Sequence, residues 1–398
     1  MPRAADVLVT AAFALLCLGV LFVNSAGMSV AVPNADGVLP ESVTFRAILF
    51  SRSTVYMVLA LGAMALVSVL PMRHMGRSTA SIAWIPVLWP VALLLLVSVY
   101  IPGLGHQANG SHRWITLPAG LTFQPSEIAK WSSILLIAWY ARTYADRLSY
   151  FFKGLLPALI ILGSITVVVT LEDLGTGVLI ATAGTIVLLA AGARIWHFIM
   201  LAPIGLLGVL AALVASPYRL GRLRTFLDPF GDPEGAGYHI IQSLVAIANG
   251  KGFGRGLGFG LQKFGYLPED RTDFLFAIVC EELGVAGAAI VLGLYGTLIA
   301  AAFVILRRQH DPFRKLLALG IVSTIAVQAL MNLMVVTGLA PTKGIALPLM
   351  SSGGTGWILT AGALGLLVAM DRAARTDPHA AADEAPSLSG RSLSVPTA

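Results

Sequence analysis

The chain has 398 residues, of which 57% are hydrophobic and 12% charged, about half the charged share of an ordinary soluble domain. Its mean hydropathy is +0.83. A chain this long and apolar cannot cover its surface with polar side chains in water, which excludes a soluble enzyme, a nucleic-acid-binding protein and a disordered scaffold. The formal net charge of +6 therefore reports membrane topology and not a nucleic-acid footprint. We expect an all-α polytopic membrane protein.

Apolar runs of about 20 residues, the length that crosses a bilayer, recur along the whole chain. The candidate spans are 6–26, 53–71, 82–101, 122–142, 154–171, 174–192, 195–215, 282–306, 316–339 and 345–370. The first run resembles a signal peptide, but its length and the spans after it favour an uncleaved helix. Cys17 and Cys280 fall in or beside these runs and are too few for a disulfide framework.

Positive charges predict the orientation of the spans. If the N-terminus is cytoplasmic, the short loops on that side carry Arg73, Arg77, Arg142, Arg147, Lys153, Arg194, Arg307, Arg308, Arg314 and Lys315. This is the positive-inside asymmetry, and it predicts that both termini are cytoplasmic. The expected organisation is one transmembrane domain, 1–371, followed by a cytoplasmic tail, 372–398, whose Ala, Ser and Pro content predicts disorder.

One extracytoplasmic connection, at about 216–281, carries cations despite facing outward. They are Arg219, Arg222, Arg224, Lys251, Arg255, Lys263 and Arg271. A long loop can translocate regardless of its charge, so the topology is unaffected. The cations suggest an anionic ligand, phosphate first, although a solvated loop with offsetting charges explains them equally well. Alternating glycines at 252–260 favour a backbone that lies close to a lipid or a neighbouring helix.

Ionisable residues at membrane depth are candidates for function, with structural ion pairs as the competing explanation. Glu127 and Lys130 stand three apart and share a helix face, which fits either reading. Asp173 can cap the helix that follows it, and Lys343 can snorkel at the outer side. Asp273 stands where the outer loop meets the membrane, where partial desolvation raises a carboxylate pKa toward the range of a general base.

Several motifs occur in one order along the chain. They are Arg113-Trp114-Ile115, Gln124-Pro125-Ser126-Glu127 with Lys130, Asp173-Leu174-Gly175-Thr176, Tyr266-Leu267-Pro268-Glu269 with Thr272-Asp273-Phe274, Glu281-Glu282-Leu283-Gly284, and Pro341-Thr342-Lys343-Gly344 leading to Ser351. Over roughly residues 5–370 their order and spacing resemble the SEDS family of cell-wall polymerases, which includes FtsW, RodA and SpoVE. The Pro-Thr-Lys-Gly segment is more similar to the division branch, FtsW, than to the elongation branch, RodA.

The resemblance implies ten transmembrane helices with a large extracytoplasmic loop between helices seven and eight. It implies a peptidoglycan glycosyltransferase that polymerises lipid II into β-1,4 glycan strands with inversion and release of undecaprenyl pyrophosphate. The expected location is the bacterial inner membrane, at the division septum. The implied partners are lipid II, a class B penicillin-binding protein with transpeptidase activity and other divisome membrane proteins, but no nucleic acid.

The resemblance also assigns roles to residues. It maps the catalytic aspartate onto Asp273, and the substrate-binding positions onto Glu127, Lys130, Asp173, Ser351, Arg113 and Trp114. In a direct displacement, Asp273 would take the proton of the acceptor hydroxyl. Arg271, Lys343, Lys130 or a divalent cation, Mg or Mn, would neutralise the leaving pyrophosphate. No metal ligands are assigned.

The sequence departs from the family at several positions, and two rival functions stay open. Asp270 and Arg271 replace the usual Ala-His, and Glu172 replaces the Pro before the aspartate of the Gln-Pro-Asp motif. A lipid II flippase would also use intramembrane charges. A non-catalytic scaffold for a transpeptidase is the other rival, and within the family an elongation role is the alternative to division. Polymer made by the purified protein from lipid II distinguishes the enzyme from both.

Overall fold

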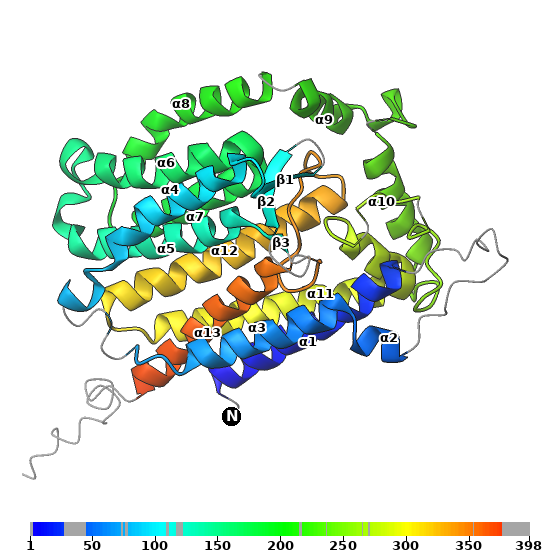
Figure 1. The fold of residues 1–398 in the computed structure, drawn as a ribbon, viewed down its shortest axis with the longest axis horizontal. Coiled ribbons are helices and arrows are strands. Elements are labelled where there is room, and N and C mark those ends of the chain that lie inside the picture. The colour runs from blue at the N-terminus through cyan, green and yellow to red at the C-terminus, as the bar shows by residue number, and fades with distance from the viewer. Residues whose placement is uncertain are drawn as a thin grey trace, which may run out of the picture.

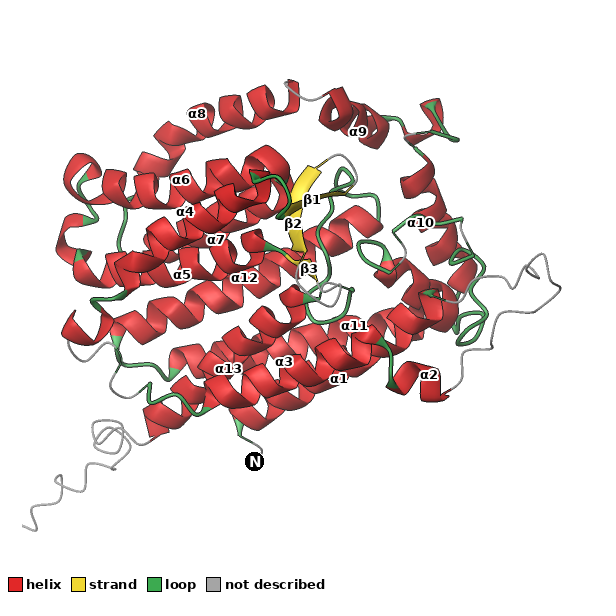
Figure 2. Ribbon diagram, viewed as in Figure 1, coloured by secondary structure: helices red, strands yellow, loops and turns green. Residues whose placement is uncertain are grey.

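The computed structural model describes residues 3–27, 45–72, 75, 79–108, 111–116, 122–214, 217–235, 237–264, 266–269, 271–352 and 354–375. These residues form a bundle of helices with a small sheet at one end (Figures 1 and 2). The α-helices are α1 (Ala4–Ala26), α2 (Phe45–Leu49), α3 (Arg52–Ser68), α4 (Leu88–Val97), α5 (Pro125–Thr143), α6 (Leu156–Glu172), α7 (Leu174–Ala190), α8 (Ile195–Val214), α9 (Pro217–Leu227), α10 (Tyr238–Gly250), α11 (Leu275–Arg307), α12 (Pro312–Val336) and α13 (Thr355–Arg375).

The polytopic helical fold expected from the sequence is confirmed. Six described segments are long and apolar enough to cross a membrane: Ala4–Ala26, Ala80–Tyr100, Phe151–Glu172, Leu275–Arg307, Pro312–Val336 and Thr355–Arg375. Shorter apolar helices cover Arg52–Ser68, Leu174–Ala190 and Ile195–Ala211. Helix α5 is not one of these candidate spans, because the three charged residues Glu127, Lys130 and Arg142 make it too polar. The count of ten spans therefore stays a prediction.

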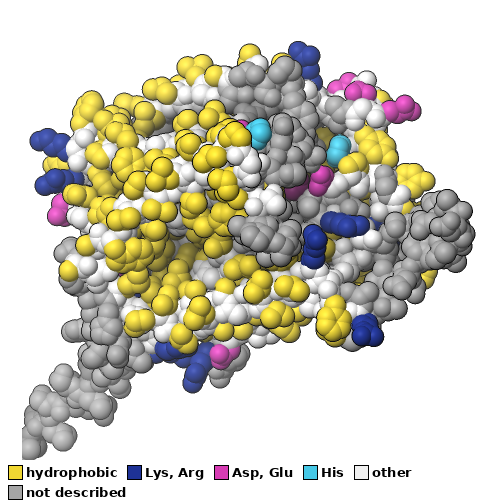
Figure 3. All heavy atoms as spheres, in the orientation of Figure 1, with side chains coloured by type: hydrophobic (Ala, Val, Ile, Leu, Met, Phe, Trp, Pro, Cys, Tyr) yellow, Lys and Arg dark blue, Asp and Glu magenta, His cyan; other side chains and the backbone are white. Residues whose placement is uncertain are grey.

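Two groups of helices form the bundle. Helix α1 packs along α11, and α3 packs along α13, so that the first and last described helices belong to one group (Figure 1). Helices α5, α7 and α12 pack on one another in the second group, with α4 and α6 beside them. On the face drawn in Figure 3, hydrophobic side chains cover most of these helices, while the visible Lys and Arg gather toward the helix ends. That distribution suits a bundle surrounded by lipid.

The small sheet fixes the approach to α5. Strands β1 (Gly105–Ala108), β2 (Ser111–Thr116) and β3 (Thr122–Phe123) are antiparallel in the order β1-β2-β3. The span expected at about 122–142 corresponds to α5, which begins at Pro125, whose fixed φ suits a first helical position. The predicted span 82–101 is not one regular helix. It combines 3₁₀ turns at Thr79–Ile82, Ile85–Val87 and Ser98–Tyr100 with α4.

The last predicted span, 345–370, begins too early. Helix α13 begins at Thr355, and the connection between α12 and α13 includes Pro341, Pro348 and the positive-φ residues Leu349 and Gly354, which are incompatible with a continuous helix. The predicted domain boundary at 371 stays a prediction, although α13 extends past that position. The helix continues to Arg375, because Asp371 pairs with Arg375 at 2.9 Å and with Arg308 at 3.3 Å. Most of the predicted tail, 376–398, lies outside the described residues.

The predicted boundary between the outer loop 216–281 and the next span differs from the structure. Helix α11 begins earlier, at Leu275, and includes both Glu281 and Glu282. Both glutamate side chains are buried and paired within the protein. Helices α9 and α10 occupy part of the rest of the loop, which is therefore partly helical.

Candidate active site

Asp273 lies directly before α11 and is tied to α12 and to the α12–α13 connection. Its backbone oxygen accepts a hydrogen bond from Asn332 Nδ2 at 2.8 Å. The same amide donates to the backbone oxygen of Ile345 at 2.8 Å. One side chain of α12 thus holds the start of α11 next to the segment that follows Lys343.

Gly344 lies between Asp273 and Arg113. A Cβ atom at position 344 would be 3.3 Å from Arg113 Nη1 and 3.3 Å from Asp273 Oδ2. The absence of a side chain at Gly344 therefore leaves the guanidinium and the carboxylate facing one small space. Strand β2 supplies the arginine, and the turn before α11 supplies the aspartate.

Asp173 stands on the other side of Arg113. Its carboxylate caps α7, accepting from Thr176 N at 3.0 Å and from Thr176 Oγ1 at 2.9 Å. The capping role expected from the sequence is therefore present. Arg113 Nη1 is also 3.6 Å from Asp173 Oδ2, and Arg113 Nε donates to the backbone oxygen of Glu172 at 3.0 Å. The guanidinium is thus held between the α6–α7 junction and Gly344.

The surroundings of Asp273 raise its pKa. Burial raises it most, the nearby carboxylates of Glu269 and Asp173 add to the shift, and Arg222 and Arg113 oppose it, giving a pKa of about 7. The pKa of Lys343 moves the opposite way, lowered by burial against the opposing effect of Asp173. A carboxylate with a pKa near neutrality is suited to accept a proton from a hydroxyl.

Glu127 and Lys130 form a second polar cluster, on α5. Lys130 is 1% exposed, and its Nζ lies 2.8 Å from Glu127 Oε2 and donates to Gln328 Oε1 at 3.0 Å. Gln328 in turn donates from Nε2 to the backbone oxygen of Ala346 at 2.9 Å. The shared helix face expected from the spacing is present, and the cluster is linked to the same connection that carries Gly344.

The two amides on α12 that join these clusters were not among the predicted site residues. Gln328 and Asn332 stand four apart and so share one helix face, from which they hold the consecutive carbonyls of Ala346 and Ile345. The available signal was a pair of amides in an otherwise apolar run, 316–339. Such residues are ordinary in soluble helices, and only membrane depth makes them notable.

Three other predicted site residues lie in different surroundings. Ser351 is buried in a turn, where its Oγ accepts from Leu347 N at 3.1 Å and its backbone oxygen accepts from Trp357 Nε1 at 2.6 Å. Trp114 stands in β2 opposite His106. Arg271 is exposed, and its guanidinium carbon would lie 3.3 Å from a Cβ at Gly27, at the end of α1.

The outer-loop cations whose side chains the structure describes do not form one ligand site. Lys263 is buried and pairs with Glu282 at 2.8 Å, so the expectation that it binds an external anion is wrong. Arg255 Nη1 is 3.8 Å from Glu281 Oε1. Arg222 donates to the backbone oxygen of Thr342 at 3.2 Å and so approaches the Asp273 site. The side chain of Arg219 and all of Asp270 lie outside the described residues.

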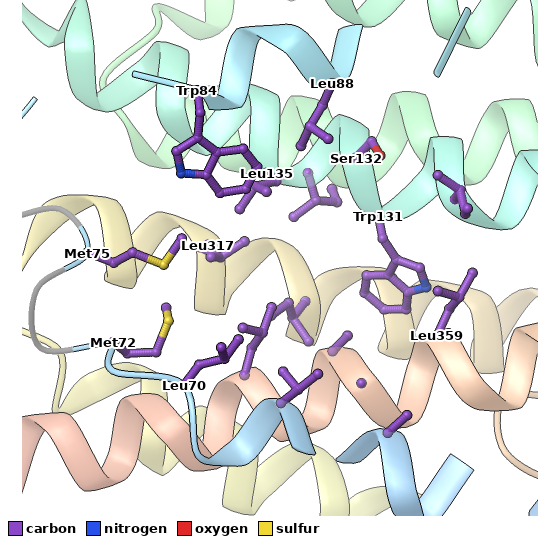
Figure 4. Close-up of a pocket in the computed structure, with 18 of the residues that line it drawn as sticks. Leu70, Met72, Met75, Trp84, Leu88, Trp131, Ser132, Leu135, Leu317 and Leu359 are labelled. Carbon is purple, nitrogen blue, oxygen red and sulfur yellow. The ribbon is translucent and has the colours of Figure 1, made fainter. Parts of the chain in front are cut away.

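An apolar pocket of about 770 Å³ opens beside the Glu127–Lys130 cluster (Figure 4). Trp131, the neighbour of Lys130, lines one end of it. Met72 after α3 and Leu317 of α12 line the other end, with Leu359 of α13 and Leu88 of α4 along the walls. The pocket is suited to a flexible hydrocarbon chain, because its surface is almost entirely apolar.

Comparison with protein families matches residues 6–376 to the FtsW, RodA and SpoVE family, described as a cell cycle protein. The chain belongs to this family. It is 40% identical over 293 residues to stage V sporulation protein E of Bacillus subtilis, covering 73% of this chain and 80% of that protein. It is 37% identical over 366 residues to the probable peptidoglycan glycosyltransferase FtsW of Thioalkalivibrio sulfidiphilus, covering 90% of this chain and 87% of that one.

Solved structures agree with the SEDS assignment. A structure titled "Structural coordination of polymerization and crosslinking by a peptidoglycan synthase complex" matches with a TM-score of 0.71 and 28% identity, covering 93% of this chain and 98% of that one. The rod shape determining protein RodA of Thermus thermophilus matches with a TM-score of 0.62 and 24% identity, covering 93% and 97% of the two chains. The RodA likeness supports the SEDS fold.

The described residues do not form a preorganised metal site. Within the described ranges, no three His, Cys, Asp or Glu side chains are grouped closely enough to hold a metal ion.

Proposed function

We propose that this SEDS protein is a peptidoglycan glycosyltransferase that polymerises lipid II into β-1,4 glycan strands with inversion and releases undecaprenyl pyrophosphate. The observation that carries the proposal is the placement of Asp273 and Arg113 on either side of Gly344. One group can accept a proton, and the other can stabilise a phosphate. Relatives named as probable FtsW glycosyltransferases support the reaction class.

The reaction is a single displacement at the anomeric carbon of the donor. Asp273 takes the proton of the acceptor 4-hydroxyl as that oxygen forms its bond to the carbon, while the bond from the carbon to the pyrophosphate oxygen breaks. Because the pKa of Asp273 is about 7, much of the group is ionised near neutral pH. One displacement inverts the anomeric centre, which converts an α-linked donor into a β-linked product.

Cations near Asp273 receive the leaving group. Arg113 can offer two parallel N–H donors to a phosphate, and Lys343 adds a second positive charge next to Gly344. Arg271 contributes from the exposed side and first meets the phosphates of an arriving donor. A divalent cation, Mg or Mn, would neutralise the pyrophosphate further by binding its oxygens together with protein carboxylate.

The apolar pocket takes up part of the prenyl chain of the lipid substrate. It begins at Trp131, beside Lys130, and extends toward Met72 and Leu317. The polar cluster of Glu127 and Lys130 then lies between the prenyl chain and the reacting headgroup. Trp114 and Ser351 complete the substrate-binding set, Ser351 by fixing the turn that precedes α13.

The biological setting follows from the same proposal. Names and motifs of the FtsW type favour septal wall synthesis in the bacterial inner membrane, with both termini cytoplasmic. The partners are a class B penicillin-binding protein and other divisome membrane proteins. The structural relative whose title describes a peptidoglycan synthase complex supports a partner of this kind.

Purified protein supplied with lipid II provides the test. Wild-type protein, alone or with its class B partner, is expected to form glycan polymer, and Asp273→Asn at equal yield is expected to form none. Polymer from Asp273→Asn at the wild-type rate would remove Asp273 from the mechanism. Movement of lipid II across vesicles without polymer would favour the flippase, a rival that the buried Glu127–Lys130 pair keeps open. Neither activity would favour a scaffold.

A further inference from the structure

Helix α11 is broken near its start. Gly284 has φ 65° and ψ −155°, a conformation outside the helical region that is essentially restricted to glycine. The break divides α11 into a short first segment, 275–283, and a long second segment, 285–307. Asp273 stands immediately before the first segment, so the orientation of that segment sets where the carboxylate lies.

A distant part of the chain fills the break. The amides of Arg255 and Gly256 donate to the backbone oxygens of Glu281 and Glu282, at 3.0 and 2.9 Å. The amides of Val285 and Ala286 donate to the backbone oxygens of Lys251 and Gly252, at 3.1 and 3.3 Å. The backbone groups freed by the break are thus satisfied by segment 251–256 instead of by the helix itself.

Glycines in this region allow the close approach. A Cβ at Gly254 would collide with the backbone oxygen of Glu282, and one at Gly250 would collide with that of Cys280. Part of the glycine alternation therefore serves contact with a neighbouring helix, one of the two readings that the sequence favoured. Gly252 and Gly258, by contrast, have open space where a Cβ would be.

Buried charges hold the end of the first segment. Lys263 Nζ is 2.8 Å from Glu282 Oε1, and both side chains are 0% exposed. Ser25 of α1 donates to the same carboxylate at 2.9 Å and accepts from Lys263 Nζ at 3.0 Å. The neighbouring Glu281 accepts the amides of Leu261 and Gln262 at 3.0 and 3.1 Å.

We propose that Lys263 and Glu282 are positioning residues for Asp273. The break at Gly284 uncouples the first segment from the long part of α11, and the Lys263–Glu282 pair couples it instead to α1 and the outer loop. The segment is then fixed at both ends, by Asn332 at Asp273 and by this pair about 13 Å away at the helical rise. The proposal rests on the role assigned to Asp273 above.

The pair acts on the chemical step and not on substrate affinity. Arg113 and Lys343 belong to β2 and to the α12–α13 connection, so neither is part of the first segment of α11. A misplacement of Asp273 of about 1 Å, by contrast, is enough to lower the rate of proton transfer strongly. Loosening the pair should therefore lower kcat and leave the KM for lipid II nearly unchanged.

The test replaces both members, because removing one alone leaves an unpaired buried charge that can prevent folding. Lys263→Met/Glu282→Gln is compared with the wild type and with Arg308→Met/Asp371→Asn. The control removes an ion pair at the far end of α11, where Arg308 Nη1 and Asp371 Oδ1 are 3.3 Å apart. We expect kcat to fall about tenfold or more in the first double variant and less than about twofold in the control.

Hydrogen exchange of a peptide covering 275–283 gives a readout that does not need activity. Exchange should rise in Lys263→Met/Glu282→Gln and stay unchanged in the control. Unchanged kcat and exchange in that variant, or losses of kcat that follow melting temperature equally in both double variants, would overturn the proposal. If exchange and kcat respond as expected but Asp273→Asn keeps full activity, the function assigned to Asp273 fails and this proposal fails with it.

Discussion

Arg113 Nη1 and Asp273 Oδ2 flank Gly344, each 3.3 Å from where a Cβ of that residue would lie. The two side chains come from segments far apart in the sequence, β2 and the turn before α11. Asp173 pairs with the same guanidinium, at 3.6 Å between Oδ2 and Nη1. Burial and the carboxylates of Glu269 and Asp173 raise the pKa of Asp273 from 3.8 to about 7, and Arg222 and Arg113 oppose that shift only in part.

Gly344→Ala should lower polymerisation about tenfold without unfolding the protein. The new methyl group would press on both Arg113 and Asp273, and small misplacements of reacting groups are costly. The position does not have a positive φ, so the backbone accepts alanine. Initial rates on lipid II measure the effect.

Gly293→Ala is the matched control for this substitution. Position 293 lies in α11 with open space around a Cβ, so the control should keep wild-type activity. Equal rates for Gly344→Ala and the wild type would show that Arg113 and Asp273 do not act together across this glycine.

The rate should depend on pH through Asp273. Since the active form is the carboxylate, kcat/KM should rise as pH increases through about 7 and level off above it. Glu269 raises the pKa of Asp273 by repulsion, so Glu269→Gln should move this limb to lower pH. A pH profile of both proteins checks the direction, and a shift to higher pH would contradict the assignment.

The sequence predicted the polytopic helical class and several local arrangements because these depend on spacing along the chain. The Glu127–Lys130 pair and the Asp173 cap are contacts between residues three apart. The burial of Lys263 depends instead on Ser25 and Glu282, which are distant in sequence. Because local sequence does not show these contacts, Lys263 was predicted to be one of the cations that face outward.

The predicted helix boundaries differ from the structure where contacts between distant segments, and not the local sequence, decide where a helix begins. Glu281 was expected at the end of the outer loop, but α11 starts before it, because the buried carboxylate of Glu281 accepts the amides of Leu261 and Gln262. Segment 251–256 forms backbone hydrogen bonds at the break at Gly284. The pattern of apolar and polar residues in either segment does not indicate this pairing. The late start of α13 follows from a connection whose carbonyls are held by Gln328 and Asn332.

Asp273→Asn should stabilise the protein at pH 8 while abolishing polymerisation. The pKa of Asp273 is raised on folding from 3.8 to about 7, so the folded state binds its proton more tightly than the unfolded state. The stability linked to this proton is present below about pH 4 and is lost as pH rises to about 7. Asparagine stays neutral at every pH, so the Asp273→Asn protein does not lose this stability as pH rises.

Melting temperatures at pH 5 and pH 8 measure this effect. The difference between Asp273→Asn and the wild type should grow toward pH 8. Asp371→Asn is the contrasting control, because it removes the ion pairs to Arg308 and Arg375 and should lower the melting temperature. A destabilised Asp273→Asn at pH 8 would contradict the unfavourable ionisation of this group.

Filling the apolar pocket should weaken use of long-chain substrate. Ala63→Phe places a ring in the pocket from α3, so the KM for natural lipid II should rise several-fold. A short-chain analogue does not reach the pocket and should keep its KM. Gly293→Phe, on α11 away from the pocket, is the control, and an equal loss for both substrates would argue against prenyl binding there.

The Glu127–Lys130 pair allows structure and substrate binding to be separated. Lys130→Met alone leaves Glu127 without its partner in the bundle, which should cost about 3 kcal/mol in the free energy of unfolding. The double variant Lys130→Met/Glu127→Leu removes both charges and should recover most of that stability. If the pair also binds substrate, the recovered protein stays inactive. Thermal unfolding and polymerisation measured on both variants decide this, since full activity in the double variant would make the pair purely structural.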